Sequence, residues 1–171
     1  DGAIAAAVAA ARAADVALVF VGRNGEWDTE GSDLEGIALP GRQDDLVAAV
    51  AAANPRTVVV LQTGGPVEMP WVGAVPAVLQ AWYPGQEGGT ALAEILTGKR
   101  SPSGKLPVSI EARWEDNPDA KSYYANEKTK GRVLYSEGVF TGYRGYDRNG
   151  VKPLFPFGFG LNYGQVSYGP P

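Results

Sequence analysis

Two short apolar runs, each preceded by a segment of helical composition, constrain the fold of this chain most strongly. Residues 16–21 and 57–62 are dominated by apolar side chains and have the length of strands. Such runs are typical of strands buried on both faces of a parallel sheet. Residues 3–14 and 40–53 have the composition of helices. The alternation predicts an α/β fold with a mainly parallel sheet and right-handed crossovers.

The same alternation continues along the chain. Residues 77–82 are expected to form a third strand, residues 88–97 a helix ended by Gly98, and residues 105–110 a shorter fourth strand. Residues 114–132 are polar and without periodicity, which predicts a long loop. We expect one α/β domain over residues 1–163, with residues 164–171 as an exit strand or linker.

The composition excludes several kinds of chemistry. The chain has no cysteine and no histidine, which removes thiol nucleophiles, Cys/His zinc sites and Ser-His-Asp triads. Acid/base work falls to Asp, Glu, Lys or Tyr, and we expect neither a metal nor an organic cofactor. A net charge of -4 gives no reason to expect nucleic acid, and the apolar runs are too short to span a membrane. The absence of cysteine fits an exported bacterial protein, so we expect a secreted or periplasmic location rather than a cytoplasmic one.

One glutamate lies in a segment suited to chemistry on a sugar. Glu137 stands between Ser136 and Gly138, within an aromatic and glycine-rich segment over residues 135–147 that has neither a clean helical nor a clean strand pattern. A glutamate on such a loop beside aromatic side chains is placed to act on a sugar or another flat-faced ligand. A surface glutamate in a tyrosine-rich loop is the alternative.

Seven motifs occur in an order that marks one family. They are Val21-Gly22, Glu30-Gly31-Ser32-Asp33, Leu39-Pro40-Gly41-Arg42-Gln43, residues 82–89, residues 101–107, residues 135–147 and residues 155–163. Together they resemble the C-terminal α/β-sandwich domain of glycoside hydrolase family 3. The resemblance implies a six-stranded, mainly parallel, flavodoxin-like sheet between helices. Because the chain begins at a helix, we expect its first strand to be missing and the sequence to be a fragment downstream of an inserted carbohydrate-binding module.

The resemblance also implies a function. Members of this family include retaining β-glucosidases, which remove terminal non-reducing β-D-glucosyl residues from β-linked oligosaccharides and from aryl or alkyl β-glycosides. Their nucleophilic aspartate lies on an N-terminal barrel domain that this chain does not contain, so we expect the isolated chain to be inactive. In many relatives a fibronectin-like domain follows. A β-xylosidase of the same family and a non-catalytic α/β carbohydrate-binding module are the alternatives.

Four residues are candidates for the site, two of them through the resemblance. Glu137 matches the acid/base glutamate. Glu30 is the second choice, because a branch similar to plant exo-β-glucanases places its acid/base in the loop after the first strand. Trp27 and Phe140 are candidates for stacking on a sugar. Aromatic neighbours of Glu137, among them Phe140, are expected to exclude water and so to raise the pKa of its carboxyl.

Overall fold

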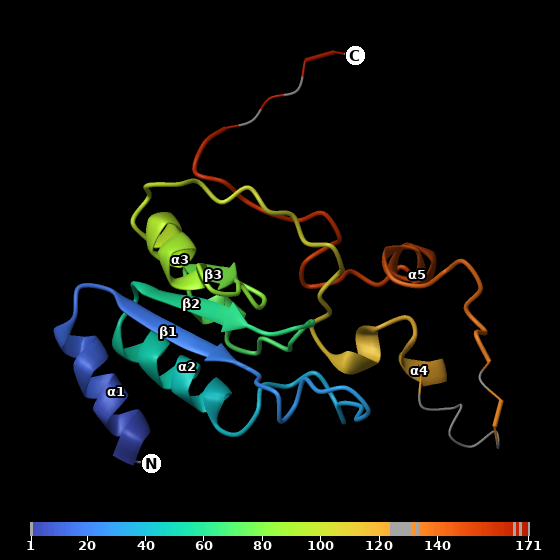
Figure 1. Cartoon of the computed structure of the whole chain (residues 1–171), viewed down its shortest axis with the longest axis horizontal. Helices are drawn as coiled ribbons and strands as arrows, with labels where there is room; N and C mark the ends of the chain where they lie inside the picture. Colours follow the sequence, from blue (N-terminus) through green and yellow to red (C-terminus); the bar gives the residue numbers. More distant parts are fainter. Residues whose placement is uncertain (1, 124–130, 133, 166, 168, 171) are drawn as a thin grey trace. The chain divides into compact units, whose positions relative to one another are not determined.

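The computed structural model describes residues 2–123, 131–132, 134–165, 167 and 169–170. The chain divides into two compact units, Asp1–Tyr83 with Glu111–Trp114, and Pro84–Ile110 with Glu115–Pro171. Figure 1 shows the path of the chain through both units.

The first unit is built on a parallel sheet. Its strands are β1 (Ala17–Gly22), β2 (Thr57–Gln62) and β3 (Ala77–Gln80), in the order β1-β2-β3. Both neighbouring pairs are parallel, with Ala17 opposite Thr57 and Val58 opposite Ala77. The helices α1 (Gly2–Ala13) and α2 (Gln43–Ala53) pack against each other beside β1 and β2 (Figure 1). The predicted α/β fold with a parallel sheet is therefore confirmed, although the sheet of the described residues has three strands rather than the six that the resemblance implies.

The core of this unit lies between α2 and the sheet. Val47 of α2 and Val59, Val60 and Leu61 of β2 are fully buried. β1 behaves differently, because Val19 is buried whereas its neighbours Leu18 and Phe20 are 48% and 50% exposed. The expectation that both faces of this strand would be buried is wrong: β1 alternates between a covered and an open face, as strands with one covered face do.

Asn54 joins the end of α1 to the start of β2. Its side-chain amide donates to the carbonyl oxygens of Ala11 and Ala14 at 2.9 and 3.0 Å. Its side-chain oxygen accepts the Arg56 N–H at 2.8 Å, and its carbonyl accepts the Thr57 hydroxyl at 2.6 Å. Helix ends leave carbonyl groups without partners inside the helix, and this buried asparagine supplies donors to them.

The second unit contains α3 (Gly88–Leu96), α4 (Ala120–Tyr123) and α5 (Tyr143–Asn149). The predicted strand over residues 105–110 is wrong. Only Ile110 forms an isolated antiparallel bridge, with Phe155, while Leu106 donates to the Phe159 carbonyl and accepts from the Gly158 N–H, both at 2.8 Å. Pro107 interrupts the segment, since proline has no N–H to give to a ladder.

Short helices also interrupt segments that were expected to be loops. Residues 114–132 contain the 3₁₀ turn η2 (Trp114–Asp116) and α4. Another 3₁₀ turn, η1 (Val72–Ala74), precedes β3 in the first unit. The helix α5 was not predicted, because glycine and aromatic residues obscure any helical period there.

Candidate active site

Glu137 lies on a tight turn just before α5. The turn spans residues 136–139, and the Phe140 N–H donates to the Glu137 carbonyl at 3.1 Å. Gly138 and Gly142 have φ angles of 61° and 54°, a region that glycine enters without the steric cost that other residues meet. These two glycines allow the chain to turn at Glu137 and to enter α5 within a few residues.

The Glu137 carboxylate is held by hydrogen bonds. Hydrogen bonds from the Ser122 hydroxyl and from the backbone N–H of Glu137 lower the pKa of this carboxyl; slight burial opposes them, and the Ser136 hydroxyl, at 3.1 Å, lowers the pKa further. Donors to the charged form favour ionisation. The expectation that aromatic shielding raises this pKa is wrong for the chain, because Tyr135 is 83% exposed and Phe140 39% exposed.

The aromatic side chains around the turn contact one another and a cation. The Arg148 guanidinium of α5 lies 4.2 Å from the centre of the Phe140 ring, within the range of a cation–π interaction. Tyr143 stacks on Phe157 with 5.1 Å between ring centres. Phe140 thus stays near Glu137 in the chain, with one face against an arginine, and its predicted role in sugar stacking remains a prediction.

Residues 117–123 pack against the same turn. A Cβ added at Gly145 would lie 2.5 Å from both Pro118 Cβ and the Phe140 carbonyl oxygen. Because a side chain at position 145 would collide with these atoms, glycine there allows α5 to lie directly against Pro118. Burial raises the pKa of the neighbouring Asp119 carboxyl. The Gly142 backbone N–H opposes this rise, and the negative charge of Glu137 adds to it. The site therefore has two carboxyl groups whose surroundings move their pKa values in opposite directions.

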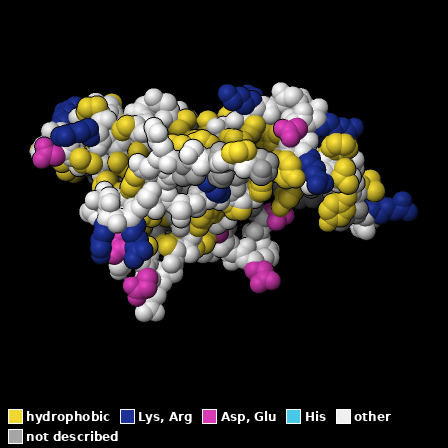
Figure 2. Space-filling model, turned by 90° about the horizontal axis from the view of Figure 1, so that it is seen from above, with side chains coloured by type: hydrophobic (Ala, Val, Ile, Leu, Met, Phe, Trp, Pro, Cys, Tyr) yellow, Lys and Arg dark blue, Asp and Glu magenta, His cyan; other side chains and the backbone are white. Residues whose placement is uncertain are grey.

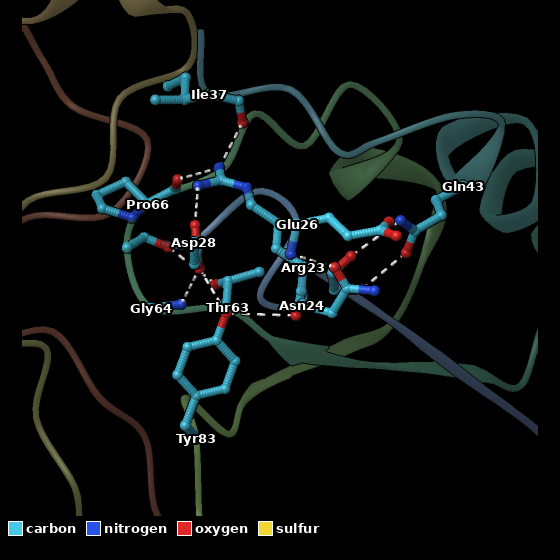
Figure 3. Close-up of polar contacts among 12 residues, drawn as sticks. Arg23, Asn24, Glu26, Asp28, Ile37, Gln43, Thr63, Gly64, Pro66 and Tyr83 are labelled. Carbon is cyan, nitrogen blue, oxygen red and sulfur yellow. Dashed lines mark hydrogen bonds and ion pairs between the residues drawn. The ribbon is translucent and has the colours of Figure 1, made fainter. Parts of the chain in front are cut away.

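A second polar cluster lies at the carboxyl ends of the strands in the first unit. The Asp28 cluster consists of Arg23, Asp28, Gly64 and Tyr83 (Figure 3). Asp28 accepts the Tyr83 hydroxyl at 2.5 Å and the Gly64 N–H at 2.9 Å, and Arg23 approaches its other oxygen at 3.4 Å. Burial acts to raise the pKa of Asp28, but the hydrogen bonds from Tyr83 and Gly64 and the charge of Arg23 outweigh it, and the pKa is lowered.

Arg23 and Tyr83 reach this cluster from β1 and β3. Arg23 follows β1 directly, is buried, and donates to the carbonyl oxygens of Ile37 and Pro66 at 3.1 and 2.8 Å (Figure 3). Trp82 has a φ of 53°, unusual for a residue with a side chain. This backbone turn ends the expected strand over residues 77–82 two residues early and precedes Tyr83. Sequence reasoning missed the cluster, although an arginine directly after an apolar strand was a visible signal.

The four predicted site residues divide between the two units. Trp27 and Glu30 lie in the loop after β1, where Glu30 is exposed and Trp27 is 42% exposed. Glu137 and Phe140 lie together on the turn before α5. The residues that sequence reasoning missed beside Glu137 are Ser122 and Asp119, which lie in a segment expected to be an irregular loop.

Other kinds of site find little support in the described part of the chain. Among those residues no group of three Asp or Glu side chains is arranged to hold a metal ion. None of the described helices is long and apolar enough to cross a membrane. Figure 2 shows basic and acidic side chains scattered over the face drawn rather than gathered into one basic patch.

Comparison with known proteins identifies the family. The model of the glycosyl hydrolase family 3 C-terminal domain matches residues 1–143, which include the Glu137 turn. A β-glucosidase from Rhizobium radiobacter is 54% identical over 174 residues, covering 100% of this chain and 21% of that protein. β-Glucosidase B from Emericella nidulans is 52% identical, covering 92% of this chain and 20% of that protein.

A solved structure agrees with this assignment. The β-glucosidase from Kluyveromyces marxianus in complex with glucose matches 94% of this chain and 19% of its own length, with a TM-score of 0.89 and 46% identity. The chain thus spans about a fifth of the length of the relatives that it matches. It belongs to the family of C-terminal domains of family 3 glycosyl hydrolases.

Proposed function

We propose that this chain is the acid/base-bearing part of a retaining β-glucosidase, with Glu137 as the acid/base. The observation that carries the proposal is the Glu137 carboxylate, held on a glycine-dependent turn by serine hydroxyls in a chain about half identical to proteins named β-glucosidase. The substrates are β-linked oligosaccharides and aryl or alkyl β-glycosides. An exported location, secreted or periplasmic, fits the absence of cysteine.

The proposed reaction needs a second carboxyl group outside this chain. In a retaining mechanism one carboxylate attacks the anomeric carbon while the other carboxyl group protonates the leaving oxygen. Water then hydrolyses the glycosyl-enzyme, and the second group takes up a proton from that water. Glu137 performs both proton transfers, and an aspartate on an N-terminal barrel supplies the nucleophile.

In this chain by itself, hydrogen bonds lower the pKa of Glu137. A general acid must carry its proton at the working pH, which hydrogen bonds to the charged form oppose. Retaining glycosidases hold their two carboxyl groups about 5–5.5 Å apart, and a like charge so close raises the pKa of its neighbour. The barrel aspartate would therefore raise the pKa of Glu137 once the two parts are together.

The test compares the wild-type enzyme, containing this chain and its barrel, with Glu137→Ala on aryl β-glucosides. Poor leaving groups should lose about 10²–10⁴-fold in rate, because they need protonation, and good leaving groups much less in the glycosylation step. Azide should restore turnover of the good leaving group and yield a glycosyl azide. Glu115→Ala, at an exposed glutamate of the same unit, is the matched control.

Other outcomes would redirect the assignment. If Glu137→Ala slows both substrates equally or slightly and azide has no effect, Glu137 is structural and Glu30→Ala should show the leaving-group dependence instead. Activity confined to aryl β-xylosides would indicate a β-xylosidase. A wild-type assembly inactive on every aryl glycoside would favour a non-catalytic carbohydrate-binding module.

A further inference from the structure

We propose that aromatic and arginine side chains beside the Glu137 turn bind the leaving group of the substrate, and that they select an aryl leaving group that carries a carboxylate. We call these side chains the aryl surface. It consists of Phe140, Tyr143, Arg144, Arg148 and Phe157. This inference rests on the proposed function of Glu137 and adds to it the chemical class of the leaving group.

A stacked pair of aromatic rings is open to solvent in the second unit. Tyr143 and Phe157 stack with 5.1 Å between ring centres and 27° between ring planes, yet they are 44% and 52% exposed. Two segments of backbone hold the pair, because Tyr143 begins α5 and the Phe157 N–H donates to the Ser109 hydroxyl at 3.2 Å. Aromatic rings offer a large contact area at a low cost in conformational entropy. The pair is therefore suited to a flat aromatic ligand.

The chain folds this surface against the Glu137 turn. The Phe140 N–H donates to the Glu137 carbonyl at 3.1 Å. The Phe140 carbonyl oxygen would lie only 2.5 Å from a Cβ at Gly145, so the first turn of α5, which begins at Tyr143, lies against the end of the Glu137 turn. The acid/base of a retaining glycosidase protonates the leaving oxygen, which places the leaving group beside it. The part of the substrate nearest to the aryl surface is thus the leaving group.

Two arginines add positive charge to these aromatic rings. Arg144 and Arg148 are four residues apart on α5 and therefore lie on one face of the helix. Their guanidinium groups lie 5.7 Å from the centre of the Tyr143 ring and 4.2 Å from that of Phe140, within cation–π range. Both arginines are exposed, and neither forms an ion pair with a carboxylate in the part of the chain that the structure describes. A guanidinium on a ring face still has N–H donors in its own plane, with which it can bind an anion.

The charge of this region favours an anionic leaving group. Residues 121–152 contain seven Lys and Arg residues against three Asp and Glu residues, whereas the whole chain has a net charge of -4. The reaction itself requires two carboxyl groups, which repel an anion unless cations lie beside it. Arginine binds carboxylates through a planar fork of two N–H groups. An aromatic ring that carries a carboxylate matches both features, with its ring on Tyr143 or Phe157 and its charge at Arg144 or Arg148.

The experiment uses the enzyme that contains this chain and its barrel. Its substrates are the para-carboxyphenyl, para-carbamoylphenyl and methyl β-glucosides. The two aryl groups have nearly the same size and differ in charge, so we take the ratio of their kcat/KM values, carboxylate over carboxamide. Comparing this ratio between a variant and the wild type cancels the intrinsic reactivity of the two phenols. Arg144→Gln and Arg148→Gln should each lower the ratio roughly 2- to 10-fold, and added salt should lower it in the wild type.

Tyr143→Ala tests the aromatic part of the surface. It should lower kcat/KM for both aryl glucosides roughly 3- to 10-fold, because the leaving group loses a stacking partner. The methyl β-glucoside has no ring to stack, so its kcat/KM should stay close to the wild-type value, which also shows that the variant is folded. Tyr143→Phe keeps the ring and should behave like the wild type on all three substrates.

A matched control accounts for the loss of one positive charge. Arg100→Gln removes an exposed arginine of the same unit that already pairs with Glu94, and it should leave the ratio unchanged. If Arg148→Gln does not fold, Arg148→Lys keeps a cation near Phe140 without the planar fork, and it should lower the ratio by a smaller factor.

Two results would overturn the proposal. A wild-type ratio in folded variants at both arginines would mean that these side chains do not select the leaving group. A Tyr143→Ala enzyme that loses the same factor on the methyl and the aryl glucosides would mean that the stacked pair contacts another part of the enzyme instead.

These failures are distinguishable from failure of the proposed function. If Glu137→Ala shows leaving-group dependence and azide rescue while the arginine and tyrosine variants keep the wild-type ratios, only the aryl surface is wrong. If the arginine variants shift the ratio while Glu137→Ala shows neither effect, the leaving group does bind at the aryl surface and the acid/base assignment is wrong.

Discussion

Asp28 makes several polar contacts that no sequence motif in the loop after β1 indicated. It accepts from Tyr83 and Gly64 and pairs with the buried Arg23. Hydrogen bonds to a charged group contribute more to stability than those between neutral groups. We therefore expect Asp28 to stabilise the end of the sheet and to make this stability depend on pH.

Asp28→Asn should lower the free energy of unfolding by about 1–3 kcal/mol at pH 7, because the amide loses the charge and turns an N–H group towards donors. The folded-state pKa of Asp28 is lowered, so its contribution is complete above the unfolded value of about 3.9 and is lost as the pH falls through the folded value. The gap between wild type and variant in urea unfolding should therefore close below about pH 4.

Asp15→Asn is the control for this prediction. Asp15 also pairs with an arginine, Arg56 at 3.3 Å, but its side chain is fully exposed, and exposed ion pairs contribute little. This variant should unfold like the wild type both at pH 7 and below about pH 4. An Asp28→Asn protein as stable as wild type at pH 7, or a gap that persists at low pH, would contradict the account of the cluster.

At the scale of elements, the contact between β1 and β2 depends on Gly22. A Cβ at this position would collide with the Gln62 carbonyl oxygen of β2. The Gln43 side chain of α2 also clamps Gly22, accepting its N–H at 2.7 Å and donating to its carbonyl at 2.9 Å. The end of one strand, its neighbour and the start of a helix thus meet at one glycine.

Gly22→Ala should destabilise the chain by about 1–3 kcal/mol, because the added methyl group forces β1 away from β2 and from the Gln43 clamp. Gly25→Ala is the matched control, since a Cβ there meets nothing within 4 Å, and its effect should stay within about 0.5 kcal/mol. Thermal and urea unfolding would measure both. Equal stabilities for the two variants would show that the sheet adjusts at Gly22 without loss.

The elements show where sequence reasoning succeeds and where it fails. β2 was predicted with its observed bounds and β1 within one residue, because apolar runs between helices leave few alternatives. α2 begins at Gln43 rather than at Pro40, since Gly41 takes a φ of 63° and Gln43 turns back to clamp Gly22. Local patterns do not contain such long-range contacts.

The same limit applies to the candidate site. The family motif gave the position of Glu137 along the chain, but Ser122 precedes it by more than a dozen residues in a polar segment without periodicity. The Asp28 cluster likewise requires the ends of β1, β2 and β3 to meet. Partners of a functional side chain that come from other elements follow from the fold, and a single sequence does not specify them.

At the scale of the whole molecule, the chain spans about a fifth of the β-glucosidases that it resembles. Several of its large apolar side chains are open to solvent, among them Leu18, Phe20 and Leu161. Under the proposed function, the chain supplies one carboxyl group of a reaction that requires two.

The isolated chain should therefore not hydrolyse aryl β-glucosides detectably, even those with good leaving groups, because the proposed nucleophile lies on the barrel. Joined to the barrel, the same chain should be active, and replacing the barrel aspartate by alanine should abolish turnover while leaving the chain folded. Release of the aryl group, followed by absorbance, measures all three proteins. Hydrolysis by the isolated chain that Glu137→Ala abolishes would mean that a second carboxyl group of this chain completes the pair, and Asp119, whose pKa feels the charge of Glu137, would be the first to replace.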